Sequence, residues 1–313
     1  MVHNPQAWNS ETLWQQLEPL LPGISVEVVD RITSTNSALI ERARMVGQER
    51  HTDRRAGRPS GGANAQQAVG NASSSRRTND LLPCLLVAEQ QTQGLERMGR
   101  TWRSVRGASL TFSLALPMAE SQDLSGLSLA VGVAVAQALD PGEQTPPKLQ
   151  LKWPNDLWLN GRKLGGILIE TVPLSDQRMV VIGLGLNVTP QAATEETAAG
   201  FSCGFACVRE LMPDITAPAL LTAVAPVLVR ALATFQAEGF APFTEAFKRR
   251  DALHGQAIVA GALSGTGAGL GAAGELLIDT SAGLQTVIGG EVSVRLNATH
   301  DTSSADTHHA NRA

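Results

Sequence analysis

The chain has 313 residues, 43% of them hydrophobic, and a formal net charge of −4. That length accommodates one large domain, or a large domain with a small one, around a real core. The slight negative charge excludes the basic footprint of a nucleic-acid-binding protein and a polybasic membrane segment. The N-terminus lacks the basic start and apolar run of a signal peptide, and the longest apolar stretches fall short of a membrane span.

The three cysteines, Cys84, Cys203 and Cys207, form no dense disulfide framework, and their number is odd. This usage favours reduced thiols in a cytosolic protein. Cys203 and Cys207 lie four residues apart, but no His or further Cys follows at zinc spacing. Two free thiols are therefore the favoured interpretation of that pair.

The first part of the chain, to about residue 46, contains a short amphipathic opening, an alternating strand at 24–32 and a helix. Ser34, Thr35 or Asn36 can cap this helix, and Gly47 is predicted to end it. Residues 48–80 are rich in Gly, Ser, Asn, Gln and Arg, with scarcely a large apolar side chain. Such a segment cannot offset its ordering entropy, so a disordered insertion is predicted.

Strands and helices alternate from there to about residue 253. Strands are predicted at 81–91, 149–153, 156–160, 163–171 and 179–188, and helices at 125–139, 220–235 and 243–252. After residue 253 the pattern changes to short β-segments at 256–263, 274–280, 284–289 and 291–297. We therefore expect a large domain at 1–253, a small β-domain of SH3-like size at 254–297 and a disordered tail at 298–313.

Gly269, Gly271 and Gly274 spell GxGxxG, the spacing of a dinucleotide-binding loop. That loop must follow a strand and open a helix, whereas this one runs into a predicted strand. A β-turn is the favoured interpretation. No GxxxxGK[ST] phosphate loop occurs in the sequence, so an ATP-using enzyme would hold the phosphates in another way.

The stretch LKWPND places Lys152 inside an apolar run and ends the strand with a Pro154-Asn155-Asp156 corner. An enclosed lysine is costly unless an anion meets it. A local ion pair with Asp156 explains Lys152 about as well as a lysine aimed at a carboxylate or phosphate, with Asp156 near a metal or another cation. Both interpretations stay open at this point.

Two further stretches have functional and structural explanations side by side. Gly183, Gly185 and Asn187 share one strand face, which suggests close approach of a ligand or of a packed helix, the helix being more common. The loop from Gly94 to Trp102 has the glycines and arginines of a lid over an anionic ligand, although a solvated loop with a buried tryptophan fits too.

In this order, Ser34-Thr35-Asn36, the loop ending in GRTW, KWPND, KLGGILIE and GLGLNV resemble the biotin protein ligases. The resemblance covers about Ile24 to Arg295 apart from the insertion, and KWPND followed by KLGGILIE is highly specific to it. The final GELLID and IGGEVSVR match the family's C-terminal domain. The fold implied is α+β: a class II synthetase-like mixed sheet with helices, plus a small C-terminal SH3-like β-barrel.

The resemblance implies an enzyme that makes biotinyl-5′-AMP from biotin and ATP and passes biotin to a lysine of a biotin carboxyl carrier protein. That carrier belongs to acetyl-CoA carboxylase or another biotin-dependent carboxylase. Two anions approach each other in this reaction, so preorganised cations matter most. Biotin, ATP and Mg²⁺ are implied, with Asp156 a candidate neighbour of the metal. We expect a cytoplasmic enzyme with no membrane partner, and a homodimer is left open.

The family's site residues carry over by position. Lys152 and Arg97 are implied as catalytic, with Lys163 a second lysine of the family pattern. The biotin pocket is implied at Ser34, Thr35, Asn36, Gln91, Gly94, Arg97 and Lys152, and the nucleotide site at Gly99, Arg100, Trp102, Lys152, Asn155, Gly185 and Asn187.

The lid departs from the family pattern, because it reads GLERMGR instead of the usual GRGRRGR. Leu95, Glu96 and Met98 replace a basic residue, a glycine and a residue that is often basic. Glu96 adds a carboxylate close to the expected anhydride, so we expect an active enzyme with a leakier lid or lower affinity.

About 33 residues precede Ser34, which is short for the DNA-binding helix-turn-helix of bifunctional members, so no DNA binding is expected. Two alternatives remain. A lipoate or octanoate ligase shares the fold and chemistry but does not normally combine KWPND with this β-domain. A non-catalytic protein that holds biotin or its adenylate is the other.

Overall fold

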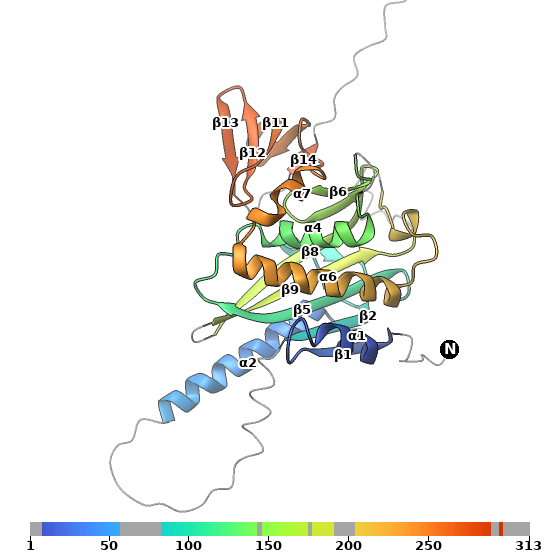
Figure 1. Ribbon diagram of the computed structural model, residues 1–313. Helices are drawn as coiled ribbons and strands as arrows, with labels where there is room; N and C mark the ends of the chain where they lie inside the picture. Colours follow the sequence, from blue (N-terminus) through green and yellow to red (C-terminus); the bar gives the residue numbers. More distant parts are fainter. Residues whose placement is uncertain are drawn as a thin grey trace, which may run out of the picture.

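The computed structural model describes residues 8–56, 83–142, 146–174, 177–190, 204–288 and 294–296, and for 46–56 and 294–296 the backbone only. A seven-stranded mixed sheet forms its centre, with strand order β1-β2-β5-β9-β8-β7-β6 (Figure 1). In that order the strands are β1 (Ser25–Ile32), β2 (Cys84–Gln91), β5 (Ser109–Ala119), β9 (Gln177–Asn187), β8 (Arg162–Pro173), β7 (Asp156–Leu159) and β6 (Leu149–Lys152). The β1–β2 pair is parallel and the other pairs are antiparallel. This confirms the predicted α+β class with a mixed sheet.

Side-chain alternation along β9 separates the two faces of the sheet. The even-numbered residues from Val180 to Leu186 join the core formed with α4 (Leu127–Leu139) and α6 (Ala217–Glu238), which lie in front of the sheet in Figure 1. The odd-numbered Met179 and Val181 pack on the opposite face against α2 (Thr35–Ala56). Each strand residue therefore serves one of two separate layers.

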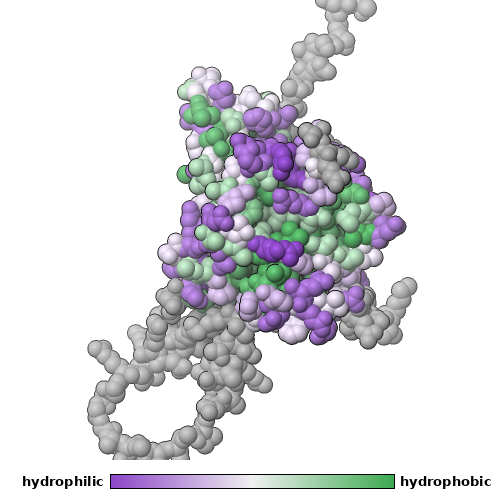
Figure 2. Space-filling model, viewed as in Figure 1, coloured by the Kyte–Doolittle hydropathy of each residue, from purple (hydrophilic) through white to green (hydrophobic). Residues whose placement is uncertain are grey.

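The expectation that every apolar stretch falls short of a membrane span is wrong for α6, which is long and apolar enough, by length and composition, to cross a membrane. Its residues from Leu220 to Phe235 are buried at helical spacing, and the helix contacts α4 and β5. A cap begins it, because Thr216 Oγ1 accepts a hydrogen bond from the Ala219 amide at 3.4 Å. Hydrophilic residues lie among the apolar ones on the face seen in Figure 2. Packing in the core of this domain accounts for the apolar composition.

The C-terminal part is a five-stranded antiparallel sheet with order β13-β12-β11-β10-β14. Its strands are β10 (Ala257–Ala260), β11 (Leu263–Leu270), β12 (Leu276–Thr280), β13 (Gly283–Val287) and β14 (Val294–Leu296). A small β-domain is confirmed. Strand β11 was missed, because its Gly, Ser, Thr and Ala residues show little strand propensity and only pairing with its neighbours makes it a strand. The segment expected at 256–263 is also wrong in extent, since β10 ends at Ala260.

The GxGxxG stretch forms the turn between β11 and β12, as the sequence predicted. Gly274 has φ +86°, and a Cβ added there would meet Leu129 Cδ1 at 3.0 Å and Gly126 Cα at 3.1 Å. Its carbonyl accepts a 3.0 Å hydrogen bond from Trp153 Nε1. This turn therefore docks the small sheet onto the start of α4, and glycine is required there for both conformation and space.

Two predicted helix boundaries are wrong. Gly47 does not end α2, which continues to Ala56, because one internal glycine costs only about 1 kcal/mol and good helix formers follow it. Residues 48–56 of the predicted disordered insertion are therefore helical. The helix expected at 243–252 is confined to α7 (Thr244–Lys248). Helix α1 (Ser10–Leu17) accounts for the amphipathic opening.

Parts of the predictions lie outside the described residues. These are the rest of the insertion, the tail from 298 and Cys203. Cys84 and Cys207 are free and buried. Burial raises the pKa of the Cys84 thiol to about 11, so this thiol stays protonated at neutral pH.

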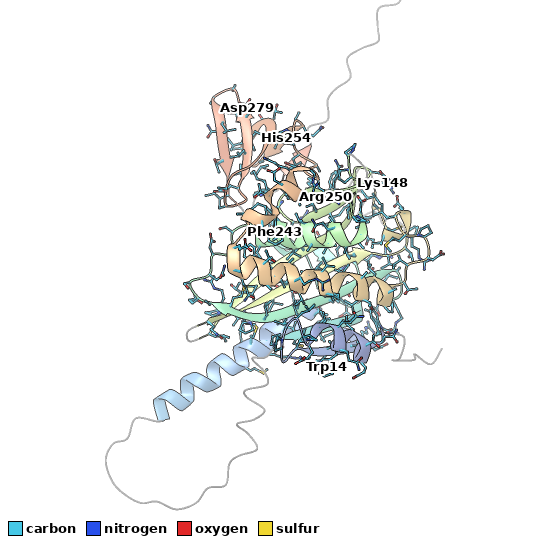
Figure 3. All side chains as sticks on the ribbon, viewed as in Figure 1. Trp14, Lys148, Phe243, Arg250, His254 and Asp279 are labelled. Carbon is cyan, nitrogen blue, oxygen red and sulfur yellow. The ribbon has the colours of Figure 1, made fainter. Side chains whose placement is uncertain are left out.

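The buried Arg250 joins three elements just below the small sheet (Figure 3). Its guanidinium donates to Asp140 Oδ2 at 3.1 Å, to the Leu149 carbonyl at 2.8 Å and to the Asp140 carbonyl. Its own backbone continues the sheet, because Leu151 N–H donates to the Arg250 carbonyl at 2.7 Å. The end of α4, the start of β6 and the chain that leads into the small sheet are thus held by one side chain.

Burial acts to raise the pKa of Asp140, but hydrogen bonds from the Leu149 amide and Arg250 outweigh it, and the pKa is lowered. A carboxyl group with a lowered pKa in the folded state stabilises the fold fully above its unfolded pKa of about 3.9. That stabilisation is lost as the pH falls through the lowered folded value. The Asp140 carboxylate is therefore ionised at neutral pH, and its contacts with Arg250 stabilise the fold fully there.

Replacing Arg250 by Met should lower the free energy of unfolding by about 3–5 kcal/mol, because Asp140 is left as a largely buried charge without its partner. Chemical denaturation at pH 7 measures the loss. Lys248→Ala is the matched control, since its 2.9 Å ion pair with Glu245 is exposed and is worth at most about 1 kcal/mol. Equal losses in the two variants would contradict the bridging role of Arg250.

Candidate functional site

A partly open cavity lies on the α2 face of the sheet, between the start of α2, the middle of the sheet and the loop after β2. Of the residues predicted for the site, Ser34, Thr35, Asn36, Gln91, Trp102, Asn155 and Gly185 line it. Lining residues that were not assigned to a site by sequence include Leu95, Glu96, Lys163, Gly166, Leu168 and Gly183. Lys152, Gly94, Arg97, Gly99, Arg100 and Asn187 are not among the lining residues that the structure describes.

The bare strand face at Gly183 receives Asn36 from the first turn of α2. A Cβ at Gly183 would lie 2.3 Å from Asn36 Oδ1, which no real contact allows. Ser113 of β5 and Leu168 of β8 are the cross-strand neighbours of Gly183. Asn36 therefore rests on the glycine with a polar contact on each side: Ser113 Oγ at 2.6 Å and the Leu168 carbonyl at 3.3 Å.

The indole of Trp102 fills the space above the second glycine. A Cβ at Gly185 would lie 2.5 Å from Trp102 Cε2. The ring is buried, yet its Nε1 has no hydrogen-bond partner among the described residues. A buried donor without a partner is uncommon and marks a place where a ligand acceptor is favourable. Of the two explanations for the glycine face, close packing is therefore the one observed. The packed groups are the side chains of Asn36 and Trp102.

The polar end of the cavity is formed by the first turn of α2 and by β2. Thr35 donates its backbone N–H to Gln91 Oε1 at 2.7 Å. Ser34 Oγ caps the helix by accepting the Ser37 amide at 3.3 Å. The backbone also joins the two segments, because Gln93 N–H donates to the Thr33 carbonyl at 2.9 Å. The Ser34-Thr35-Asn36 triplet therefore both caps α2 and lines the cavity.

The charged end of the cavity is dominated by Lys163, whose side chain is 2% exposed. Its Nζ lies 2.8 Å from Glu96 Oε1 and 3.1 Å from Asp156 Oδ1. Gly166 lies beside the lysine chain, and a Cβ there would make only an ordinary 3.5 Å contact with Nζ. Asp156 is thus ion-paired with Lys163, a cation of the kind that the functional explanation of the KWPND corner allowed for without naming the residue.

Burial acts to lower the pKa of Lys163, but Asp156 and then Glu96 outweigh it, and the pKa is raised above the usual lysine value. The ammonium form is therefore kept at neutral pH. Removing either carboxylate from it would weaken that hold and free the cation for another anion. This is the electrostatic centre of the cavity.

Lys152 lies next to this centre but outside the cavity lining. Strand register places it opposite Asp156, which in turn is opposite Gly166, and Gly166 is opposite Gly185. Its ammonium lies 4.4 Å from the centre of the Trp158 ring, a cation–π contact. Lys152 thus belongs to this row across the sheet, whereas Lys163 pairs with Trp158, and of the two lysines only Lys163 lines the cavity.

The lid segment closes over the cavity through Glu96. The Glu96 carboxylate contacts Lys163 with one oxygen, and its other oxygen lies 3.8 Å from Arg100 Nε. Arg97 is half-buried, and burial lowers its pKa despite the opposing effect of Asp156. Met98 has φ +60°, an uncommon conformation for a residue with a side chain. Leu95 and Met98 are exposed at the tip of the lid.

Two other predicted residues have structural contacts. Asn155 Nδ2 donates to the Ile167 carbonyl at 2.7 Å, and the Ile167 amide donates back to the Asn155 carbonyl at 3.0 Å. Asn187 is buried at the end of β9, where its Nδ2 donates to the Ala206 carbonyl at 3.1 Å. Asn155 therefore shapes the cavity wall, whereas Asn187 fastens the strand end to a neighbouring segment.

The arrangement suits an elongated ligand with two different ends. Neutral hydrogen-bonding groups line one end, a buried ammonium occupies the other, and an indole with a free donor lies between them. A buried cation of this kind binds and polarises a carboxylate or phosphate. Covalent catalysis by the protein is not needed for such a site to transfer an activated acyl or phosphoryl group.

Known proteins share parts of this chain's sequence and its fold. The profile of the Biotin/lipoate A/B protein ligase family matches residues 75–187. The bifunctional ligase/repressor BirA of Escherichia coli is 31% identical over 215 residues, which are 67% of this chain and 65% of BirA. The chain thus spans just under two thirds of that relative.

Two more relatives are covered almost fully. The biotin–[acetyl-CoA-carboxylase] ligase of Paracoccus denitrificans is 28% identical over 212 residues, 66% of this chain and 88% of that protein. The biotin protein ligase of Aquifex aeolicus, solved in complex with biotin and ATP, has 25% identity and a TM-score of 0.64. That match covers 87% of this chain and 99% of the Aquifex chain.

Substituting Ala at Gly183 or Gly185 should lower the free energy of unfolding by about 1–3 kcal/mol, because the new methyl group displaces Asn36 or Trp102. Denaturation midpoints measure the loss. Gly166→Ala is the matched control on the neighbouring strand, where the added methyl makes only an ordinary 3.5 Å contact. Unchanged stability in Gly183→Ala would show that Asn36 does not depend on the bare strand face.

Proposed function

Because the chain belongs to the biotin/lipoate A/B protein ligase family, we propose that it is an ATP-dependent biotin–protein ligase. It joins biotin to ATP as biotinyl-5′-AMP and then transfers biotin to a lysine of a biotin carboxyl carrier protein. The observation that carries the proposal is the buried Lys163 ammonium at one end of a cavity whose other end is neutral and polar. Biotin has the matching parts, a neutral ureido ring and a carboxylate at the end of an aliphatic chain.

The proposed orientation follows from this match. The ureido ring lies against Ser34, Thr35 and Asn36 with Gln91 behind them, and the carboxylate meets Lys163. The nucleotide lies beside Trp102, whose free Nε1–H is a donor for an acceptor of the adenylate. Gly94, Gly99 and Arg100 belong to the lid, and Gly185 gives Trp102 its space.

In the first step a biotin carboxylate oxygen attacks the α-phosphorus of ATP, and the bond to pyrophosphate breaks. Lys163 offsets the charge of the two anions as they approach. Its raised pKa keeps it cationic throughout. In the second step the amine of the carrier lysine attacks the biotinyl carbonyl, and AMP leaves.

Lys163 is favoured over Lys152 for this role. Lys163 lines the cavity, whereas the Lys152 ammonium contacts the Trp158 ring beside it. Arg97, half-buried near Asp156, is a second cation for the phosphates when the lid rearranges. The assignment of Lys152 as the catalytic lysine stays a prediction, and the variants below compare the two.

When bound with ATP, Mg²⁺ would offset the negative charge of the phosphates. The described residues contain no cluster of three or more His, Cys, Asp or Glu side chains that could hold a metal. This donor set fits a metal held mainly by phosphates and water, with Asp156 and Glu96 as nearby carboxylates. The proposed partner is a carrier protein of a biotin-dependent carboxylase, and the proposed location is the cytoplasm. Neither a DNA partner nor a homodimer is part of the proposal.

Biotin-dependent exchange of labelled pyrophosphate into ATP tests the proposed function, with lipoate as the control substrate. Exchange with biotin is the expected result, and biotinylation of an added carrier domain should follow. Exchange with lipoate alone would move the chain to the lipoate ligases. Biotin binding without exchange would favour the non-catalytic alternative.

The same assay compares the two lysines. Lys163→Ala should lower the exchange rate by about 100- to 1,000-fold, the effect of losing one preorganised charge at a transition state. Lys152→Ala is the matched variant on the adjacent strand, and we expect a smaller loss because its ammonium lies outside the cavity lining. The reverse order would restore the assignment made from sequence.

Replacing Glu96 by Gln should tighten biotin binding by about tenfold, or roughly 1.4 kcal/mol, because the biotin carboxylate then no longer displaces a charged partner of Lys163. Isothermal titration at pH 7 measures the dissociation constant. Glu120→Gln is the control, since that carboxylate is exposed and contacts Arg178 far along β5. Weaker binding in Glu96→Gln would mean that Glu96 holds Lys163 in its productive position.

A further inference from the structure

A chain of buried hydrogen bonds runs from the cavity to Glu170 on β8. It begins at Thr35 and passes through Ser113 and Asn36. Thr35 and Asn36 are each 3% exposed and Ser113 is 0% exposed, so solvent does not compete for these bonds. Only Glu170 at the outer end is partly exposed.

The orientation of the Asn36 amide is dictated by its two neighbours on β8. Asn36 Nδ2 lies 2.9 Å from Glu170 Oε2 and 3.3 Å from the Leu168 carbonyl. A carboxylate and a carbonyl only accept hydrogen bonds, so the amide nitrogen must face them and the amide oxygen must face away. Glu170 supplies the stronger of the two bonds because its oxygen is charged.

The next link is fixed by the same reasoning. Ser113 Oγ lies 2.6 Å from Asn36 Oδ1, and an amide oxygen has no proton to give. The Ser113 hydroxyl is therefore the donor, and its only proton is committed to Asn36. Its lone pairs then accept from the other hydroxyl within reach, Thr35 Oγ1 at 2.7 Å.

The Thr35 proton has one competing acceptor. Gln91 Oε1 lies 3.1 Å from Thr35 Oγ1, but it already accepts the Thr35 backbone N–H at 2.7 Å. The shorter contact to Ser113 would otherwise bring two lone pairs together, so the proton is directed to Ser113. All protons of the chain then point toward Glu170, and Thr35 Oγ1 keeps a lone pair for the cavity.

We propose that Glu170 is a positioning residue that sets the donor and acceptor pattern of the ligand pocket, so that Thr35 accepts a hydrogen bond from a ligand N–H. The inference rests on the proposed function, since a ureido N–H of biotin is the donor that this pattern selects. Glu170 does not line the cavity. It acts through Asn36, which packs against Gly183, and through Ser113, the cross-strand neighbour of Gly183 on β5.

The test compares Glu170→Leu with Glu170→Gln. Leucine removes the acceptor at similar size, whereas the amide oxygen of glutamine still accepts from Asn36 Nδ2. Titration with biotin alone should show binding about tenfold weaker in Glu170→Leu, the size of one hydrogen bond of roughly 1.4 kcal/mol, and nearly unchanged binding in Glu170→Gln. ATP affinity should be the same in both. An equal loss in the two variants would overturn the acceptor argument.

A second measurement separates positioning from a structural effect. Biotin methylated on either ureido nitrogen lacks one N–H, and one of the two derivatives should bind the unaltered protein much less tightly than biotin. In Glu170→Leu this discrimination should shrink several-fold, because Thr35 is no longer held as an acceptor. Undiminished discrimination would overturn the proposal, whatever happens to overall affinity.

Ser113→Ala keeps the test available if Glu170→Leu fails to fold. It removes the middle link with a small change in volume, and it should show the same selective loss of discrimination. Failure of the unaltered protein to bind biotin would reject the proposed function itself. Normal binding with full discrimination in Ser113→Ala would reject only the role of the chain that ends at Glu170.

Discussion

The buried ammonium of Lys163 is the constraint on which the rest of the site depends. Removing a lysine from water is unfavourable unless carboxylates stay close to it, and here Asp156 and Glu96 do so at 3.1 and 2.8 Å. Asp156 comes from a fixed strand corner, whereas Glu96 comes from the lid. One partner is therefore permanent and the other is exchangeable. A ligand carboxylate can replace the lid carboxylate without leaving the cation exposed to an apolar interior.

The division of labour along one strand explains where the cavity lies. On the α2 face of β9, Met179 and Val181 are covered by the helix, while Gly183 lies under Asn36 of its first turn and Gly185 lies under Trp102. The same strand thus stabilises the domain at one end and makes space at the other. Because the opposite face carries an uninterrupted apolar row under α4 and α6, the glycines weaken the sheet little.

Sequence patterns predicted most strands of the central sheet, the small β-domain and the Ser34-Thr35-Asn36 end of the site, because alternation and capping are local properties. They did not rank Lys163 above Lys152, since both are single lysines in apolar strands and only the sheet register and the lid decide which one is enclosed. Ser113 and Glu170 were missed as well. Their signal was a polar residue within an apolar strand, which is common, and their partners lie 77 and 134 residues away. Gly47 misled because propensity is a weak guide to where a helix ends.

The strap formed by residues 250–252 has a consequence for association of the chain. It pairs with Leu151 of β6, the last strand on that side of the sheet, through bonds of 2.7 and 3.0 Å. A strand edge with free amides and carbonyls is a template for other strands and promotes aggregation. The strap covers part of this edge with the protein's own backbone. The linker to the small sheet therefore also blocks strand addition beside the KWPND corner, so the central sheet is shielded at this edge.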